Sequence, residues 1–105
     1  MAPAVSLARL AAFAAVADAG SFTAAAERLN TTKSAVSQAV TVLERELGSQ
    51  LLQRSTRKLA ITEAGEAFLA DCRALLAGAE AAMERARTGR AQLSGTLRLT
   101  SPQAI

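Results

Sequence analysis

Apolar residues recur at helical spacing in three segments of the first half of the chain. In Leu7–Ala19 they repeat every three or four residues, and Gly20 follows as the expected C-cap. A second segment starts at the expected N-cap Ser21 and ends at the polar turn Asn30–Thr32, and a third runs from there to Gly48. The pattern predicts three short helices, of which the second and third form a helix-turn-helix.

The third segment places its polar and apolar residues on opposite faces. Its apolar stripe recurs at steps of four, three and four residues: Val36, Val40, Leu43 and Leu47. At about 100° per residue, the opposite face carries, after Lys33 at the helix entrance, Ser34, Ser37, Gln38, Thr41 and Arg45. Such short hydrogen-bonding side chains suit a helix that lies in the major groove of DNA, so we predict a recognition helix. An ordinary exposed helix, on which Ser34 and Ser37 are simply tolerated, is the alternative.

The residues after the third helix predict a small β-hairpin. Short apolar groups at residues 51–52 and 59–61 flank the polar run 53–58, which we interpret as a two-stranded wing with its tip at residues 55–58. Three cations lie within five residues of this run and are mixed with Ser and Thr: Arg54, Arg57 and Lys58. They suit contacts with phosphates or with the minor groove. A solvated loop is the alternative, and the position directly after a recognition helix favours the wing.

A fourth amphipathic segment is much longer than the others. Thr62 is the expected cap of a helix from Glu63 to about Arg90, with acidic residues in its first turn and Arg87 and Arg90 in its last. A seam of apolar and small residues starts at Gly65 and continues at alternating steps of four and three residues. A helix of roughly 40 Å is too long to be covered by so small a head, so unless it folds back on its own core we expect it to bind a second copy of the chain. The predicted dimerisation residues are Leu69, Cys72, Leu76, Ala79, Met83 and Ala86.

Beyond this helix the pattern predicts the start of a further domain. Gly89 and Gly95 are expected to loosen the chain, and residues 96–100 alternate like a strand that has no partner to pair with here. The predicted organisation is therefore a winged helix-turn-helix head at residues 1–62, a linker and dimerisation helix at 63–90, and a hinge with the first strand of an absent effector-binding domain at 91–105.

Charge is distributed unevenly along the 105 residues. The net charge is +3, and residues 1–62 hold all of it, with seven basic and four acidic side chains, whereas residues 63–105 carry five of each. Half of the residues are apolar and only three are aromatic, which is typical of helices packed closely through small side chains. A positive bias confined to one half indicates a nucleic-acid-binding surface in the head.

The residue types present exclude several kinds of site. The chain has no His and a single cysteine, so imidazole ligation, a cysteine-based zinc site and an internal disulfide are excluded. No paired-carboxylate cleft or Gly-rich phosphate loop is recognisable, and no apolar run approaches the ~20 residues that span a bilayer. We expect no enzyme activity, no cofactor, no metal, no membrane contact and a cytoplasmic location. Cys72 is interpreted as a small buried apolar residue, in preference to a redox switch.

Four short motifs in register resemble one known family. In order along Ala12–Leu69 they are GSFTAAAERL, SAVSQ-x-V-x-x-LE-x-ELG, an L-x-R sequence and ITEAG. Their order and spacing resemble the N-terminal DNA-binding region of LysR-type transcriptional regulators. The resemblance implies a mainly α fold, a winged helix-turn-helix with a three-helix core and a small β-hairpin wing, followed by a long dimerising linker helix. In this family an effector-binding domain normally follows, and GTLRLTSP resembles its opening strand, so a small-molecule effector would bind in that domain.

The resemblance also implies roles for individual residues. The helix-turn-helix corresponds to residues 22–41, and the positions that face bases are Lys33, Ser34, Ser37 and Gln38, with Arg57 of the wing entering the minor groove. Contacts with the DNA backbone are expected from Ser21, Thr23, Thr31, Thr32, Thr41, Arg45, Arg54, Thr56 and Lys58. Lys33 stands where Gln is usual and Gln38 where Arg is common, so the preferred DNA sequence should differ from the commonest family pattern.

These observations predict a homodimeric transcriptional regulator that binds double-stranded DNA sequence-specifically, on a partly palindromic operator. Pairing of dimers into a tetramer in the full-length protein stays open. Two alternatives are another winged-helix regulator, such as a molybdate-responsive type, and a helix-turn-helix protein-interaction module that does not bind DNA.

Overall fold

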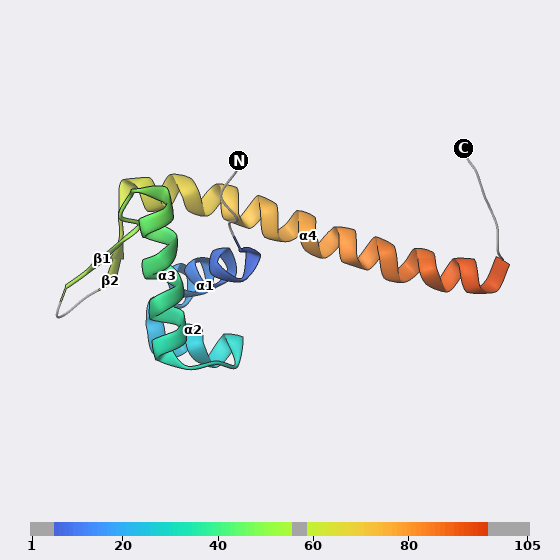
Figure 1. Cartoon of the computed structure of the whole chain (residues 1–105), viewed down its shortest axis with the longest axis horizontal. Helices are drawn as coiled ribbons and strands as arrows, with labels where there is room; N and C mark the ends of the chain where they lie inside the picture. Colours follow the sequence, from blue (N-terminus) through green and yellow to red (C-terminus); the bar gives the residue numbers. More distant parts are fainter. Residues whose placement is uncertain (1–5, 56–58, 97–105) are drawn as a thin grey trace.

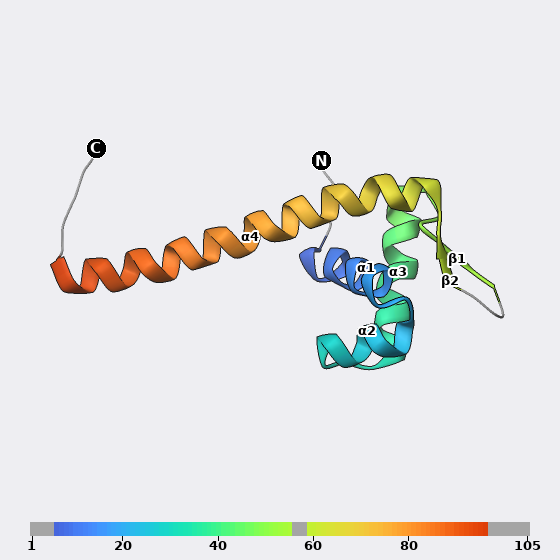
Figure 2. The ribbon, with the colours of Figure 1, turned by 180° about the vertical axis from the view of Figure 1, so that it is seen from behind.

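The structure, a computed structural model, describes residues 6–55 and 59–96, and within them it contains four helices and one two-stranded hairpin. The elements follow in the order α1 (Leu7–Ala19), α2 (Phe22–Leu29), α3 (Lys33–Leu47), β1 (Leu52–Arg54), β2 (Leu59–Ile61) and α4 (Glu63–Thr96). Helices α1 to α3 cluster into a head, the hairpin extends from one side of it, and α4 continues far beyond the head as a single rod (Figure 1). The view from behind shows the same arrangement (Figure 2). The predicted mainly α winged helix-turn-helix is confirmed.

Helix ends in the head are set by residues that satisfy unpaired backbone groups. At the N-termini of α1, α2 and α3 a side-chain oxygen accepts a hydrogen bond from a nearby backbone N–H, the acceptors being Ser6, Ser21 and Thr32. At their C-termini the backbone turns through the left-handed region, at Gly20 (φ 79°), Asn30 (φ 56°) and Gly48 (φ 68°). Asn tolerates this conformation better than most residues, which allows a short turn between α2 and α3. The predicted boundaries of these three helices are confirmed.

The core of the head is built from α1, α3, the residues at the entry to the wing and two residues of α4, Leu69 and Cys72. Its largest fully buried side chains are Phe13, Leu43, Leu51, Leu52, Val16, Val36, Val40 and Cys72. The small side chains of Ala25 and Ala26 let α2 pack closely against this cluster. Three leucines that the sequence pattern places on apolar faces are exposed instead, because each is the first or last residue of its helix: Leu7 (50%), Leu29 (38%) and Leu47 (39%).

The first turns of α4 belong to the head. The rings of Phe13 on α1 and Phe68 on α4 lie 6.0 Å apart between centroids. Leu69 and Cys72 are buried in the same core, at 7% and 0% exposure, and Arg73 pairs with Asp18 at the end of α1. The expectation that the whole stripe of α4 is uncovered is therefore wrong for its first part, where the helix does fold back on its own core.

Helix α4 also ends later than predicted. It continues to Thr96, so Gly89 and Gly95 lie inside it, and its last turn contains no basic residue. A glycine costs about 1 kcal/mol in a helix interior, which is not enough to end a helix of 34 residues with many Ala, Glu and Arg. The predicted strand at residues 96–100 is corrected at Thr96, which is helical, and its other residues lie outside the described part of the chain.

Candidate nucleic-acid interface

The polar face of α3 is open to solvent. Lys33, Ser34 and Gln38 are exposed and Ser37 is half-buried, and with Thr41 they line one shallow depression on this face. The opposite face is anchored by three side chains at 0–1% exposure, Val36, Val40 and Leu43. Four of the five residues predicted to face bases are thus brought together on one accessible surface. The fifth, Arg57, lies outside the described residues.

The N-terminal ends of α2 and α3 present further hydroxyl groups. Thr32 Oγ1 accepts a hydrogen bond from the backbone N–H of Ala35 at 3.0 Å, and Ser21 Oγ accepts one from Ala24 at 3.0 Å. A hydroxyl oxygen that accepts in this way keeps its own proton to donate. The predicted backbone-contacting residues of this region are exposed at Thr23, Thr31 and Thr32 and half-buried at Ser21.

Two predicted phosphate contacts, Arg54 and Thr41, are engaged with each other. Arg54 Nη1 donates to Thr41 Oγ1 at 3.3 Å, and Arg54 Nη2 lies 3.6 Å from Glu44 Oε1. The guanidinium carbon is 5.1 Å from the centre of the Phe22 ring. Both residues therefore lie at the edge of the recognition face, and each already has a protein partner there.

Glu44 is a structural anchor that the sequence reasoning missed. Its Oε2 accepts hydrogen bonds from the backbone N–H groups of Leu51, at 2.8 Å, and Leu52, at 3.0 Å. The side chain is 16% exposed. An acid in the last turns of a helix is unfavourable beside the helix dipole, and this was the signal that Glu44 needed a specific partner.

The two glutamates that flank Arg45 on α3 have partners elsewhere in the head. Local ion pairs with them are the alternative to a DNA contact for Arg45. In the structure Glu46 pairs with Arg9 of α1 at 3.1 Å, Glu44 holds the entry to the wing, and Arg45 is exposed. Arg45 stays a predicted backbone contact.

The wing is a hairpin and not an irregular loop. Strands β1 and β2 pair antiparallel, with Leu52 opposite Ile61, Gln53 opposite Ala60 and Arg54 opposite Leu59. Leu52 is buried and Ile61 half-buried, which holds the base of the hairpin to the head. Thr56, Arg57 and Lys58 lie outside the described residues, so the predicted contacts of the tip stay predictions.

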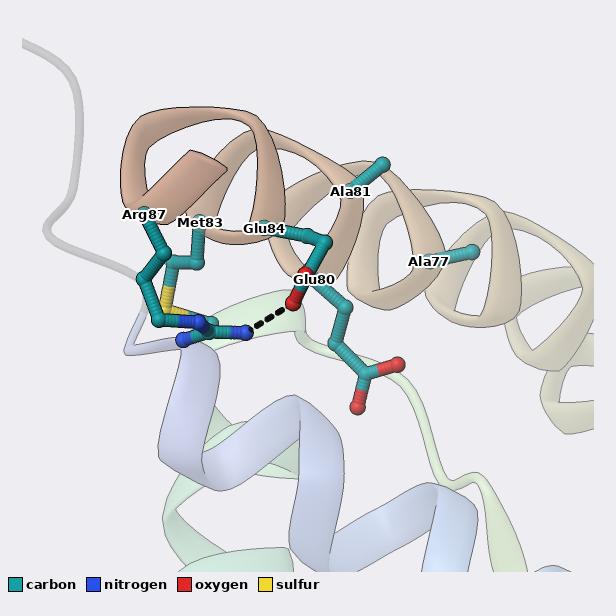
Figure 3. Close-up of a pocket in the computed structure, with 6 residues that line it drawn as sticks. All are labelled: Ala77, Glu80, Ala81, Met83, Glu84 and Arg87. Carbon is teal, nitrogen blue, oxygen red and sulfur yellow. Dashed lines mark hydrogen bonds and ion pairs between the residues drawn. The ribbon is translucent and has the colours of Figure 1, made fainter. Parts of the chain in front are cut away.

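The predicted dimerisation stripe divides into a covered and an uncovered part. Leu69 and Cys72 are buried inside the head, Leu76 and Ala79 are half-buried, and Met83 and Ala86 are exposed. Figure 3 shows the uncovered part, where Met83, Glu80 and Arg87 extend from the helix and Arg87 pairs with Glu84 at 2.5 Å. The correction is that Leu69 and Cys72 make contacts within the chain, because α1 covers the first turns of α4.

Cys72 is a buried residue of the core, as interpreted from the sequence. Burial, and to a lesser extent the charge of Asp71, raises the pKa of its thiol from 9.0 to about 11.

Among the described residues no group of three or more His, Cys, Asp or Glu is placed to hold a metal ion. None of the helices in the same residues has both the length and the apolar character needed to cross a membrane.

Residues 7–66 match a family described as bacterial regulatory helix-turn-helix protein, lysR family. The chain is 43% identical over 96 residues to the probable HTH-type transcriptional regulator LtrA of Klebsiella pneumoniae. The aligned region covers 91% of this chain and 31% of that protein. The chain is 41% identical over 99 residues to the HTH-type transcriptional regulator PtxR of Pseudomonas aeruginosa, with 94% and 32% covered. The chain spans about a third of the length of these curated relatives.

Solved structures with similar folds include complexes with DNA. A CbnR_DBD–DNA complex is similar with a TM-score of 0.74 and 39% identity, covering 81% of this chain and 98% of that one. A BenM_DBD/catB site 1 DNA complex gives a TM-score of 0.75 at 32% identity, covering 79% and 93%. Oxidized OxyR of Corynebacterium glutamicum gives 0.81 at 36% identity, covering 87% of this chain and 28% of that one. The similarity to the DNA-bound domains extends over most of both chains.

Proposed function

Because the chain belongs to the LysR family of bacterial regulatory helix-turn-helix proteins, we propose that it binds double-stranded DNA sequence-specifically and acts in a transcriptional regulator. In this proposal α3 enters the major groove, and the wing contacts the adjacent minor groove through Arg57. Lys33, Ser34, Ser37 and Gln38 contact base edges. The residues around them contact the sugar–phosphate backbone.

The observation that carries the proposal is the open polar face of α3. Its exposed side chains are short or flexible and rich in hydrogen-bonding groups, and the buried face fixes the helix to a rigid core. Such a helix can approach base edges closely without losing its own packing. Lys33 can donate to guanine O6 and N7 or to a phosphate, and Gln38 can pair with adenine through two hydrogen bonds.

We further propose that the chain dimerises through the uncovered part of α4. Met83 is 53% exposed, and beyond the head none of the other described helices and strands lies against the stripe (Figure 1). A two-fold dimer would place two recognition helices on a partly palindromic site. Analytical ultracentrifugation of the whole protein would show whether dimers pair into tetramers.

The remaining functional assignments follow from the family. A cytoplasmic protein that acts on the nucleoid is proposed, with no cofactor and no catalytic activity in this region. We place a small-molecule effector, if the whole protein has one, in an effector-binding domain outside residues 1–90. Residues 1–62 are proposed as the DNA-binding domain, α4 (Glu63–Thr96) as the linker helix and 97–105 as the connection to that further domain.

Selection of bound duplexes from a random pool tests DNA binding and half-site spacing together. We expect an enriched, partly palindromic sequence and an affinity that falls steeply with salt, because phosphate contacts release counterions. Recovery of random duplexes alone would remove the claim of sequence specificity. A chain that binds no duplex at low salt would favour the alternative of a different class, a protein-interaction module.

A further inference from the structure

Arg54, the last residue of β1, connects the wing to both helices of the helix-turn-helix. Its guanidinium donates to Thr41 Oγ1 at 3.3 Å and lies 3.6 Å from Glu44 Oε1, and both partners are on α3. It also lies over the ring of Phe22 on α2, with Cζ 5.1 Å from the ring centre. One side chain therefore contacts three others on two helices.

These three contacts depend on the shape of the guanidinium group. Its planar fork has several N–H donors that can bond two oxygens at once, while its flat face lies on an aromatic ring. The ammonium group of a lysine is a compact point charge without a planar face. Lysine at position 54 would preserve the charge but could not keep the same three partners together.

The contacts lie between the two parts of the proposed DNA-binding surface. Thr41 is one helical turn beyond Ser37 and Gln38 on α3. On the other side, the tip of the wing begins at the residue after Arg54. The contacts of Arg54 are therefore placed where they can set the direction in which the wing leaves the recognition helix.

We propose that Arg54 is a positioning residue that fixes the wing relative to the recognition helix, in place of the phosphate contact predicted from the sequence. The proposal rests on the proposed function, because it matters for DNA only if α3 and the wing enter adjacent grooves together. Loss of the contacts of Arg54 then weakens DNA binding through geometry and not through charge. Thr41 acts in the same unit, as the partner of Arg54 on the recognition helix.

The first experiment measures amide hydrogen exchange in the free chain. Arg54→Lys and Thr41→Val both preserve the net charge and remove contacts of this unit. We expect amide exchange in residues 52–54 and 59–61 to be faster by roughly tenfold in each, about 1.4 kcal/mol of lost protection, and exchange in α1 to be unchanged. Arg28→Lys, at an exposed arginine in the last turn of α2, is the matched control. Wild-type exchange in Arg54→Lys would overturn the proposal.

The second experiment measures affinity for a selected duplex at several salt concentrations. We expect Arg54→Lys and Thr41→Val to weaken binding by a similar factor, roughly tenfold, and the double variant to be little weaker than either, because the two residues act as one unit. Independent phosphate contacts would give additive losses and a nearly unaffected Arg54→Lys, and that result would overturn the proposal. If the wild-type chain binds no duplex, the proposed function fails, while the exchange measurement still decides whether Arg54 holds the wing.

Discussion

A Cβ atom placed on Gly65, in the first turn of α4, would lie only 2.2 Å from the carbonyl oxygen of Leu51, at the entry to the wing. The same joint contains Thr62, whose hydroxyl donates to the carbonyl of Gln50 at 2.7 Å and whose Oγ1 accepts from the N–H of Gly65 at 2.9 Å. Helix α4 therefore starts against the backbone of the wing, and a side chain at position 65 has no space.

Substitution Gly65→Ala should lower the free energy of unfolding, because the backbone of Leu51 must move to admit the methyl group. We expect a loss of about 2–3 kcal/mol, in the range for overpacked sites, measured by thermal and denaturant unfolding. Gly78→Ala is the matched control, since nothing lies within 4 Å of its Cβ position. That variant should be neutral or more stable by up to about 1 kcal/mol. Equal effects of the two substitutions would contradict the close approach at Gly65.

Substitution Glu44→Ala should destabilise the entry to the wing, because it leaves the N–H groups of Leu51 and Leu52 without their acceptor. The expected loss is about 1–3 kcal/mol in the free energy of unfolding. Glu46→Ala, which breaks only the exposed pair with Arg9, should cost less than about 1 kcal/mol. The two variants are compared by urea unfolding. A larger loss for Glu46→Ala would mean that Glu44 is not the anchor.

Substitution Gln38→Ala should relax discrimination at one base pair of the binding site. If the side chain pairs with a base edge, the penalty for the wrong base there should fall by about 1–3 kcal/mol, measured with a panel of duplexes that each differ at one position. Arg45→Ala is the comparison. Loss of a backbone contact should weaken binding to all duplexes alike and reduce the slope of log affinity against log salt concentration by about 1. Uniform weakening by Gln38→Ala would refute base reading by this residue.

Substitution Met83→Glu should separate the proposed dimer, because it places a charge on the uncovered stripe of α4. We expect the dimer dissociation constant to rise at least roughly a hundredfold, since a buried unpaired charge costs several kcal/mol. Ala81→Glu, two residues earlier on a different side of the helix, should leave association unchanged. Analytical ultracentrifugation over a concentration series measures both. A wild-type chain that stays monomeric throughout would contradict dimerisation through α4.

The buried thiol of Cys72 should make stability fall at alkaline pH. Its pKa in the folded chain is about 11, against 9.0 as the ordinary value, so between these values the unfolded chain loses the proton while the folded chain keeps it. The stabilising contribution is fully present below pH 9 and is lost as the pH rises toward 11, by about 2–3 kcal/mol.

Denaturant unfolding at several pH values measures this slope, and Cys72→Ala should remove it. The chain contains no Tyr, so phenol titration does not overlap with that of the thiol. An identical alkaline slope in wild type and Cys72→Ala would show that other groups cause it.

The secondary structure could be predicted from the sequence because it depends on residues that are close together in the chain. The caps at Ser21, Thr32 and Gly48 act within a few residues of themselves, and apolar spacing alone assigns the two faces of α3. The helix boundaries of the head, the hairpin and the open polar face therefore followed from the sequence. The family motifs extended the same reading, since they are short and lie in one continuous stretch.

Contacts between elements were decided only by the tertiary structure. Spacing shows that Leu69 and Met83 lie on one stripe of α4. It does not show that α1 extends only far enough to cover Leu69 and leaves Met83 exposed. It likewise could not show that Arg54 is turned toward Thr41 and Glu44, or that Gly65 meets Leu51. These contacts depend on the angles at which helices and strands pack, and those angles are set by all the buried side chains together and not by the residues on either side of a position in the chain.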